Sequence, residues 1–139
     1  MKYEDPIYQI DGELLMVAIP GKQKLGWIST KVILYIFASR THVCLMVGYP
    51  GQRPESATML HPMRVQAYKG SVLVIDTASF YGSEGVSYSG EDSYEFTDLL
   101  CSGSPLTIKL TRHDIATGAH HLYTYNFNSS LFDNYYSRL

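Results

Sequence analysis

LTIKLTRH at residues 106–113 and HHLYTYNF at 120–127 decide the fold of this chain. Both stretches alternate between apolar and polar residues, which is the pattern of a β-strand with one buried face. The segment between them, 114–119, contains Asp, Thr and Gly and predicts a turn. The two strands therefore form an antiparallel hairpin.

The register of this hairpin follows from its side chains. If His113 lies opposite His120, six large apolar or aromatic residues share one face: Leu106, Ile108, Leu110, Tyr123, Tyr125 and Phe127. The other face then carries Thr107, Lys109, Thr111 and His113 against His120, Leu122, Thr124 and Asn126. A slip by one residue would mix the two faces, so we predict this register.

Further strands are predicted upstream, where short apolar or alternating runs are bounded by turn residues. We expect these strands at 13–19, 31–38, 42–49, 63–68 and 71–77. The first run ends at Pro20-Gly21, and Ser39–Thr41 and Lys69-Gly70 form the turns of two hairpins. The runs 31–38 and 42–49 are apolar on both faces, so we expect central strands that are covered on both sides.

Two short helices complete the prediction. One spans 94–101 behind a cap at Asp92 or Ser93, and the other lies in 130–139 behind a cap at Asn128 or Ser129. We therefore expect one β-rich domain over residues 1–139. Its class is mainly β, an antiparallel β-sandwich or partly closed barrel with two short helices in the C-terminal half.

Composition excludes several partners. Eleven basic residues stand against thirteen acidic ones with no Lys/Arg cluster, which argues against direct binding of nucleic acid. The longest apolar run, 32–38, is far shorter than the roughly 20 residues that span a membrane. The N-terminus lacks the pattern of a signal peptide, so we expect a soluble, cytoplasmic protein. In that compartment Cys44 and Cys101 are expected to be free thiols, although the sequence leaves their pairing open.

The stretch ASFYGSEGVSYSGEDSY at 78–94 carries the strongest functional signal. We expect a long loop here, and Tyr mixed with Ser and Gly is typical of binding loops. Its candidate binding residues are Phe80, Tyr81, Glu84, Tyr88, Glu91, Asp92 and Tyr94. The aromatic residues would act as anchors, and the acids would form a negative rim for a partner protein with a basic surface.

The resulting hypothesis is a non-enzymatic protein-binding module, such as an inhibitor, an immunity protein or an anti-defence factor. One alternative is a small-molecule-binding protein or small hydrolase with a pocket at the end of the sheet, which would contain His61 or the pair His113 and His120. Another alternative is a structural subunit that assembles through a sheet edge. The sequence leaves enzymatic activity and oligomeric state open, and it favours the non-enzymatic class.

No cofactor and no metal is expected. His113 and His120 would supply two ligands, whereas a zinc site needs three or four. Gly82, Gly85 and Gly90 follow a strand, but their spacing matches no nucleotide-binding motif and no Lys follows them.

The order of elements from Tyr94 to Leu139 is a short helix, a Ser-Gly turn, the strand PLTIKL, the turn ATG, a strand that ends in YNF, and the terminal segment SSLFDNYYSRL. This third of the chain resembles the C-terminal layout of the β-sandwich proteins grouped with invasion-associated locus B and the type VI secretion accessory protein VasI. Those families usually have an export signal and a Gly before the last helix, where this chain has Asn128-Ser129-Ser130. The resemblance implies a non-catalytic sandwich and carries over no functional residue.

Overall fold

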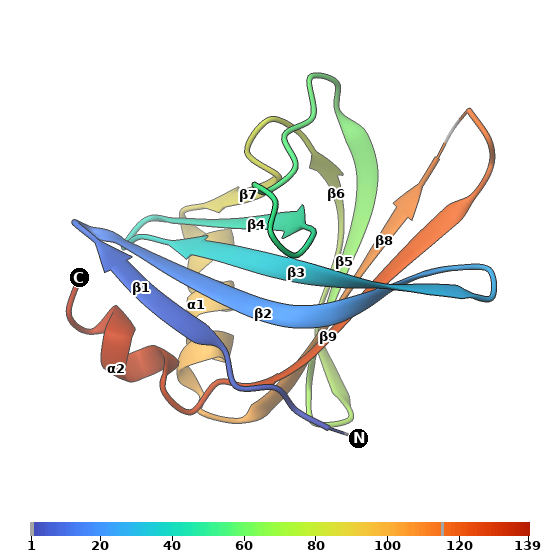
Figure 1. Ribbon diagram of the computed structural model, residues 1–139. Coiled ribbons are helices and arrows are strands. Elements are labelled where there is room, and N and C mark those ends of the chain that lie inside the picture. Colours follow the sequence, from blue (N-terminus) through green and yellow to red (C-terminus); the bar gives the residue numbers. More distant parts are fainter. Residues whose placement is uncertain (1, 115) are drawn as a thin grey trace.

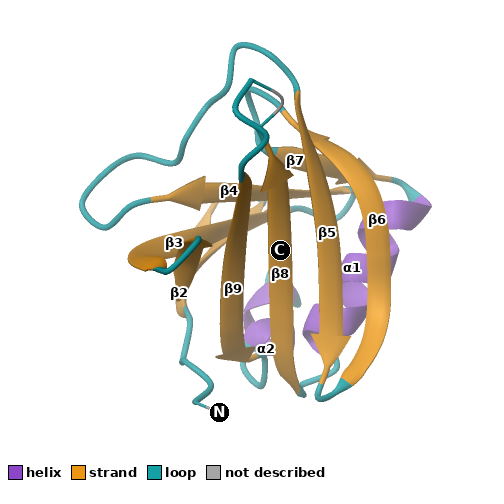
Figure 2. Ribbon diagram, turned by 90° about the vertical axis from the view of Figure 1, so that its right-hand side faces the viewer, coloured by secondary structure: helices purple, strands orange, loops and turns teal. Residues whose placement is uncertain are grey.

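The chain forms one antiparallel nine-stranded sheet that curls into a nearly closed barrel, with two helices packed at one end (Figure 1, Figure 2). This description comes from a computed structural model, which covers residues 2–114 and 116–139. The predicted class, a mainly β protein with a partly closed barrel and two short helices in the C-terminal half, is confirmed. Part of the predicted 114–119 turn, at residue 115, lies outside the described residues.

The elements have the following bounds: β1 (Ile7–Asp11), β2 (Leu14–Leu25), β3 (Ile28–Ala38), β4 (His42–Gly48), β5 (His61–Lys69), β6 (Val72–Tyr81), β7 (Val86–Ser89), α1 (Glu91–Cys101), β8 (Pro105–His113), β9 (His120–Asn128) and α2 (Phe132–Tyr136).

The strands follow one another around the barrel in the order β6-β5-β8-β9-β2-β3-β4-β7, and β1 pairs with β2 outside this path. The first half of β2 pairs with β1 and the second half with β9, while β3 pairs along the whole length of β2. Strand β2 thereby joins two half-sheets. Because β6 and β7 stand at the two ends of the path, the barrel has a seam between them.

The predicted C-terminal hairpin is confirmed in full. His113 pairs with His120, Leu110 with Tyr123, and Leu106 with Phe127. All six residues predicted for the apolar face are buried in the single hydrophobic core. Alternation therefore fixed both the pairing of β8 with β9 and the face that they turn toward the interior.

Strand β2 does not end at Pro20-Gly21, as the sequence predicted, but continues to Leu25. Gly21 is required there because a Cβ atom at this position would overlap the Tyr125 ring and the carbonyl oxygen of Thr124 on β9. The Pro20-Gly21 pair, which the sequence predicted to be a turn, thus lies where β2 approaches β9 closely.

The strands of the hairpin β3–β4 are covered less completely than predicted. Their inward residues are buried, whereas outward residues such as Ile33, Phe37 and Met46 are half-buried. The prediction of full cover on both sides is therefore wrong, because one layer of sheet with two short helices leaves part of the outer face in contact with solvent.

Helix α1 begins at Glu91, directly after Gly90, rather than behind a cap at Asp92 or Ser93. The Ser93 hydroxyl instead donates to the carbonyl oxygens of Gly90 at 2.7 Å and Thr41 at 3.1 Å, which ties the helix to the β3–β4 turn. Helix α2 inserts Phe132 into the core. Both helices connect to the end of the barrel where β7 and β9 finish.

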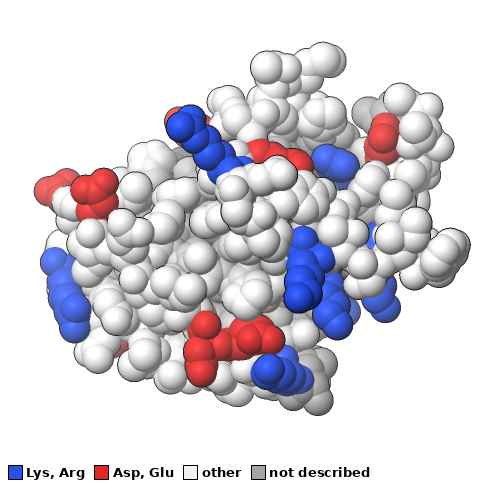
Figure 3. Space-filling view, in the orientation of Figure 1, with Lys and Arg blue, Asp and Glu red and all other residues white. Residues whose placement is uncertain are grey.

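Neither helix is long and apolar enough to cross a membrane. Charged side chains are scattered over the face shown in Figure 3, which has no broad patch of one sign. Cys44 and Cys101 are both free and half-buried. Burial and the neighbouring Asp133 raise the pKa of Cys101 to about 12, so this thiol stays protonated at neutral pH.

Candidate functional site

Residues 78–94 do not form the long loop that the sequence predicted. They comprise the end of β6, a tight turn, the short strand β7 and the start of α1. The turn is held by Gly82 and Gly85, whose backbone N–H groups donate to each other's carbonyl oxygens at 2.9 and 3.1 Å. In β7 the buried residues Val86 and Tyr88 alternate with exposed serines, so a Ser/Gly-rich composition conceals a regular strand.

Two of the predicted anchors are buried in the core, so their prediction as exposed anchors is wrong. The Tyr81 hydroxyl donates to the carbonyl oxygen of Glu55 at 2.7 Å and accepts from the Val47 N–H at 2.9 Å. The Tyr88 hydroxyl lies 3.0 Å from that of Thr77. Burial raises the pKa of Tyr81 to about 12, and it also raises the pKa of Tyr88. The hydroxyl of Tyr81 thus joins β6 to β4 and to residue 55, and that of Tyr88 joins β7 to β6.

The other predicted binding residues lie on the surface. Phe80 is 59% exposed and Tyr94 is 48% exposed. Glu84, Glu91 and Asp92 are exposed as well. Phe80 and Glu84 flank the β6–β7 turn, whereas Glu91, Asp92 and Tyr94 stand on the first turn of α1.

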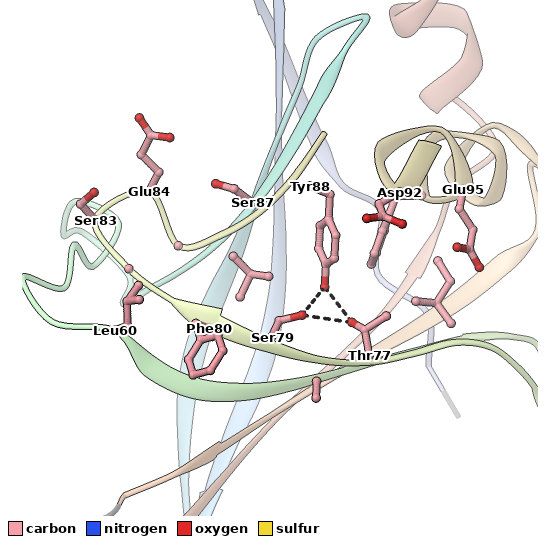
Figure 4. Close-up of a pocket in the computed structure, with 16 residues that line it drawn as sticks. Leu60, Thr77, Ser79, Phe80, Ser83, Glu84, Ser87, Tyr88, Asp92 and Glu95 are labelled. Carbon is pink, nitrogen blue, oxygen red and sulfur yellow. Dashed lines mark hydrogen bonds between the residues drawn. The ribbon is translucent and has the colours of Figure 1, made fainter. Parts of the chain in front are cut away.

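Between these two groups runs the seam of the barrel. After the Gly82–Gly85 bridge the two strands separate, because β6 pairs with β5 and β7 pairs with β4. Among the described residues, side chains rather than a backbone ladder then connect β6 to β7. Figure 4 shows Tyr88 pointing from β7 to Thr77 and Ser79 on β6, and its ring packs on Phe96 of α1 at 4.7 Å between centroids.

The seam is hollowed by a cavity of about 630 Å³. The residues that line it include Leu60 and Phe80 near the turn and the acids Glu84, Asp92 and Glu95. In Figure 4 the Asp92 and Glu95 side chains come from α1, whereas the Glu84 carboxylate points away from Tyr88. No Lys or Arg is among the residues that line it. The seam therefore combines two strand edges with apolar side chains and an acidic rim.

The histidines lie elsewhere. His113 and His120 meet on the outer face of the sheet, with their Nδ1 atoms 3.4 Å apart, in a shallow groove that also includes Arg64 and Asp76. Arg64 donates to both carboxylate oxygens of Asp76, at 2.7 and 2.9 Å. Residues 2–114 and 116–139 contain no group of three His, Cys, Asp or Glu side chains placed to hold a metal ion.

His61 lines a separate cavity at the end of the barrel. The alternative hypothesis of a small-molecule-binding protein places its pocket at the end of the sheet with His61 inside. This cavity is enclosed by residues from five strands and from the segment between β4 and β5. The sequence singled out His61 but gave no reason to join it to the other residues there.

No known protein family, no curated protein and no solved structure matches this chain. The resemblance of residues 94–139 to the invasion-associated locus B and VasI proteins therefore stays a prediction.

Proposed function

We propose that this protein binds an extended segment of another protein along the seam between β6 and β7. The observation that supports this proposal is the pair of neighbouring strand edges, β6 and β7, which border one cavity. Among the described residues, the Gly82–Gly85 bridge is the only backbone pairing between them. A strand edge presents backbone N–H and C=O groups that a peptide can satisfy by adding a strand. Main-chain hydrogen bonds would supply affinity, and the side-chain walls would supply specificity.

Charge selects the class of segment. The carboxylates of Glu84, Asp92 and Glu95 line the seam without a basic residue among its walls. A bound segment with Lys or Arg would gain charge-assisted hydrogen bonds to these carboxylates, whereas an acidic segment would be repelled. Phe80 and Leu60 offer an apolar contact near the turn, so the preferred segment alternates basic and apolar residues.

Such a module fits the role of an inhibitor, an immunity protein or an anti-defence factor, since each of these acts by occupying a segment of its target. The cytoplasm is the location that we propose for this encounter, because free thiols such as Cys44 and Cys101 are usual in a reducing compartment.

The experiment is a selection of random linear peptides displayed on phage against the intact protein, followed by titration of the enriched peptides. We expect enrichment of peptides rich in Lys or Arg that alternate with apolar residues. Their binding should perturb the backbone amide resonances of residues 77–88. The double variant Asp92→Lys/Glu95→Lys should bind these peptides roughly tenfold more weakly or worse, because it places positive charge beside the basic side chains.

The matched control is Asp11→Lys/Glu13→Lys, which makes the same change in net charge on the exposed β1–β2 turn, outside the cavity walls. This control should bind the peptides as tightly as the wild type. Enrichment without basic residues, or equal affinity in the seam variant, would contradict the proposal. Oligomers that grow with concentration and that compete with the peptides would instead favour a subunit that assembles through this edge.

A further inference from the structure

The end of the barrel opposite the helices is lined by polar side chains that point inward. On β8 the inward row Leu106, Ile108 and Leu110 continues with Arg112. The inward-facing residues of the neighbouring strands also change from apolar to polar toward this end of the barrel. These rows end in a ring of six residues that we call the mouth: Gln23, Tyr49, His61, Tyr81, Arg112 and His121.

Inside the mouth lies a cavity of about 370 Å³. Val47, Ala57 and Met63 form its apolar walls, and Tyr81 and Tyr123 lie at its inner side. Ligand pockets have volumes of roughly 300–1,000 Å³ and occur often in the mouths of β-barrels. This cavity is therefore large enough for a small ligand.

Tyr81 and Tyr123 line this cavity, and Tyr125 is the next inward residue after Tyr123 on β9. All three hydroxyls are neutral. Burial raises the pKa of Tyr123 to about 12 and that of Tyr125 well above its ordinary value. Tyr123 accepts a hydrogen bond from Gln23 Nε2 at 3.3 Å. The Tyr125 side chain is fully buried, and its hydroxyl has no partner among the described residues. A buried hydroxyl without a partner is rare in folded proteins.

Two opposite charges line the same cavity without pairing. The guanidinium of Arg112 and the carboxylate of Glu55 both act on the hydroxyls of Tyr81 and Tyr123. Within the part of the chain that the structure describes, no ion pair joins them to each other or to any third residue. Asp114, the acid closest to Arg112 in the sequence, accepts hydrogen bonds from Ala116 and Thr117 in its own turn.

Glu55 is held at the mouth by its backbone. Its N–H donates to the carbonyl oxygen of Val47 at 2.7 Å, and its own carbonyl oxygen accepts from the Tyr81 hydroxyl at 2.7 Å. The main chain of Glu55 is thus fixed beside the cavity before any ligand arrives, so that only its side chain has to be ordered on binding.

We infer that the mouth binds a small zwitterion of the amino-acid class, with its carboxylate at Arg112, its ammonium group at Glu55 and its side chain against Val47 and Met63. A ligand with one charge would leave the opposite charge of the cavity unpaired, whereas a zwitterion satisfies both. This site is separate from the seam, and the inference is independent of peptide binding there.

The test is ligand-observed saturation-transfer NMR on the full chain with a mixture of the common L-amino acids, followed by titration of the best binder. We expect at least one amino acid to bind. Its decarboxylated amine and its deaminated acid should each bind roughly tenfold to a hundredfold more weakly, because each lacks one charge-assisted contact. Arg112→Gln and Glu55→Gln should each weaken binding of the amino acid by a similar factor.

Lys109→Gln is the matched control for Arg112→Gln, since it removes a positive charge from the outward face of the same strand. Lys109→Gln and the seam variant Asp92→Lys/Glu95→Lys should bind the amino acid like the wild type. Glu55→Gln keeps the test valid if Arg112→Gln fails to fold, because the Glu55 carboxylate makes no described hydrogen bond. Absence of binding by all amino acids, equal binding of the singly charged analogues, or unchanged affinity in Glu55→Gln would each overturn the inference.

Discussion

The two ends of this barrel are built differently. At the end that the helices cover, inward rows finish in aromatic side chains such as Phe127, and Phe132 of α2 fills the remaining space. At the other end the rows finish in Gln23, Arg112 and His121, and Arg112 lines a cavity there. The covered end contributes stability through apolar burial, whereas the open end keeps polar groups that stability alone would not require.

The largest expected effect breaks the covered end. Phe132→Ala removes a side chain that is 1% exposed, and we expect the free energy of unfolding to fall by about 3–5 kcal/mol. Urea denaturation followed by circular dichroism measures this loss. His61→Ala, at the exposed rim of the mouth, is the comparison and should change stability by less than about 0.5 kcal/mol. Similar losses for both variants would show that the two ends do not differ in this way.

A smaller effect of opposite sign is expected at Tyr125, which follows Tyr123 along the inward row of β9. Tyr125→Phe removes the buried hydroxyl that has no partner among the described residues and leaves the ring in place. The ligand-free protein should become more stable by about 1–3 kcal/mol, because the desolvated hydroxyl no longer opposes folding. The same urea titration measures the gain. A clear loss of stability would mean that the hydroxyl is bonded within the folded protein.

The smallest effect is a dependence on pH. Burial, and next the nearby Arg112, lower the pKa of His121 below its ordinary value of 6.5. As the pH falls, His121 therefore becomes protonated in the unfolded chain before it does so in the folded protein. The stability that neutral His121 contributes is fully present above its unfolded pKa of about 6.5 and is lost as the pH falls toward its lower pKa in the folded protein. The urea midpoint can be measured at pH 7.5 and pH 5.5, which lie about one unit above and below the ordinary pKa of His. We expect this midpoint to fall less from the higher to the lower pH in His121→Gln than in the wild type. Equal falls in the two proteins would assign the dependence to other groups.

The C-terminal hairpin could be predicted because its strands are adjacent in sequence and each has a single apolar face. Strands β1 and β7 could not be predicted in this way. Strand β7 has only four residues, two of which are serines, and it pairs with β4, which ends 38 residues earlier in the chain. This separation in the sequence also explains why Tyr81 and Tyr88 were wrongly predicted to be binding anchors. A Tyr in a Ser/Gly-rich segment reads as exposed until the neighbouring strand that covers it is known.

The mouth was partly visible in the sequence. Arg112 continues the apolar row of β8 two residues after Leu110, and this break in a buried row is a signal that an inward charge is present. The sequence could not show that His61 and Glu55 line one cavity with Arg112, because the three residues come from segments whose arrangement is set only when the sheet closes.

The narrow join between the half-sheets has a consequence during synthesis of the chain. Among the described residues, only Lys22, Gln23 and Lys24 of β2 pair with β9, and their partners lie about 100 residues further along the chain. This part of β2 therefore emerges from the ribosome long before its partner exists and waits as an unpaired edge, which is the kind of surface that recruits other chains into aggregates. The exposed Lys22 and Lys24 place two positive charges on that unpaired edge. Charged side chains on a strand edge oppose pairing with other chains, so these lysines reduce aggregation until β9 has been made.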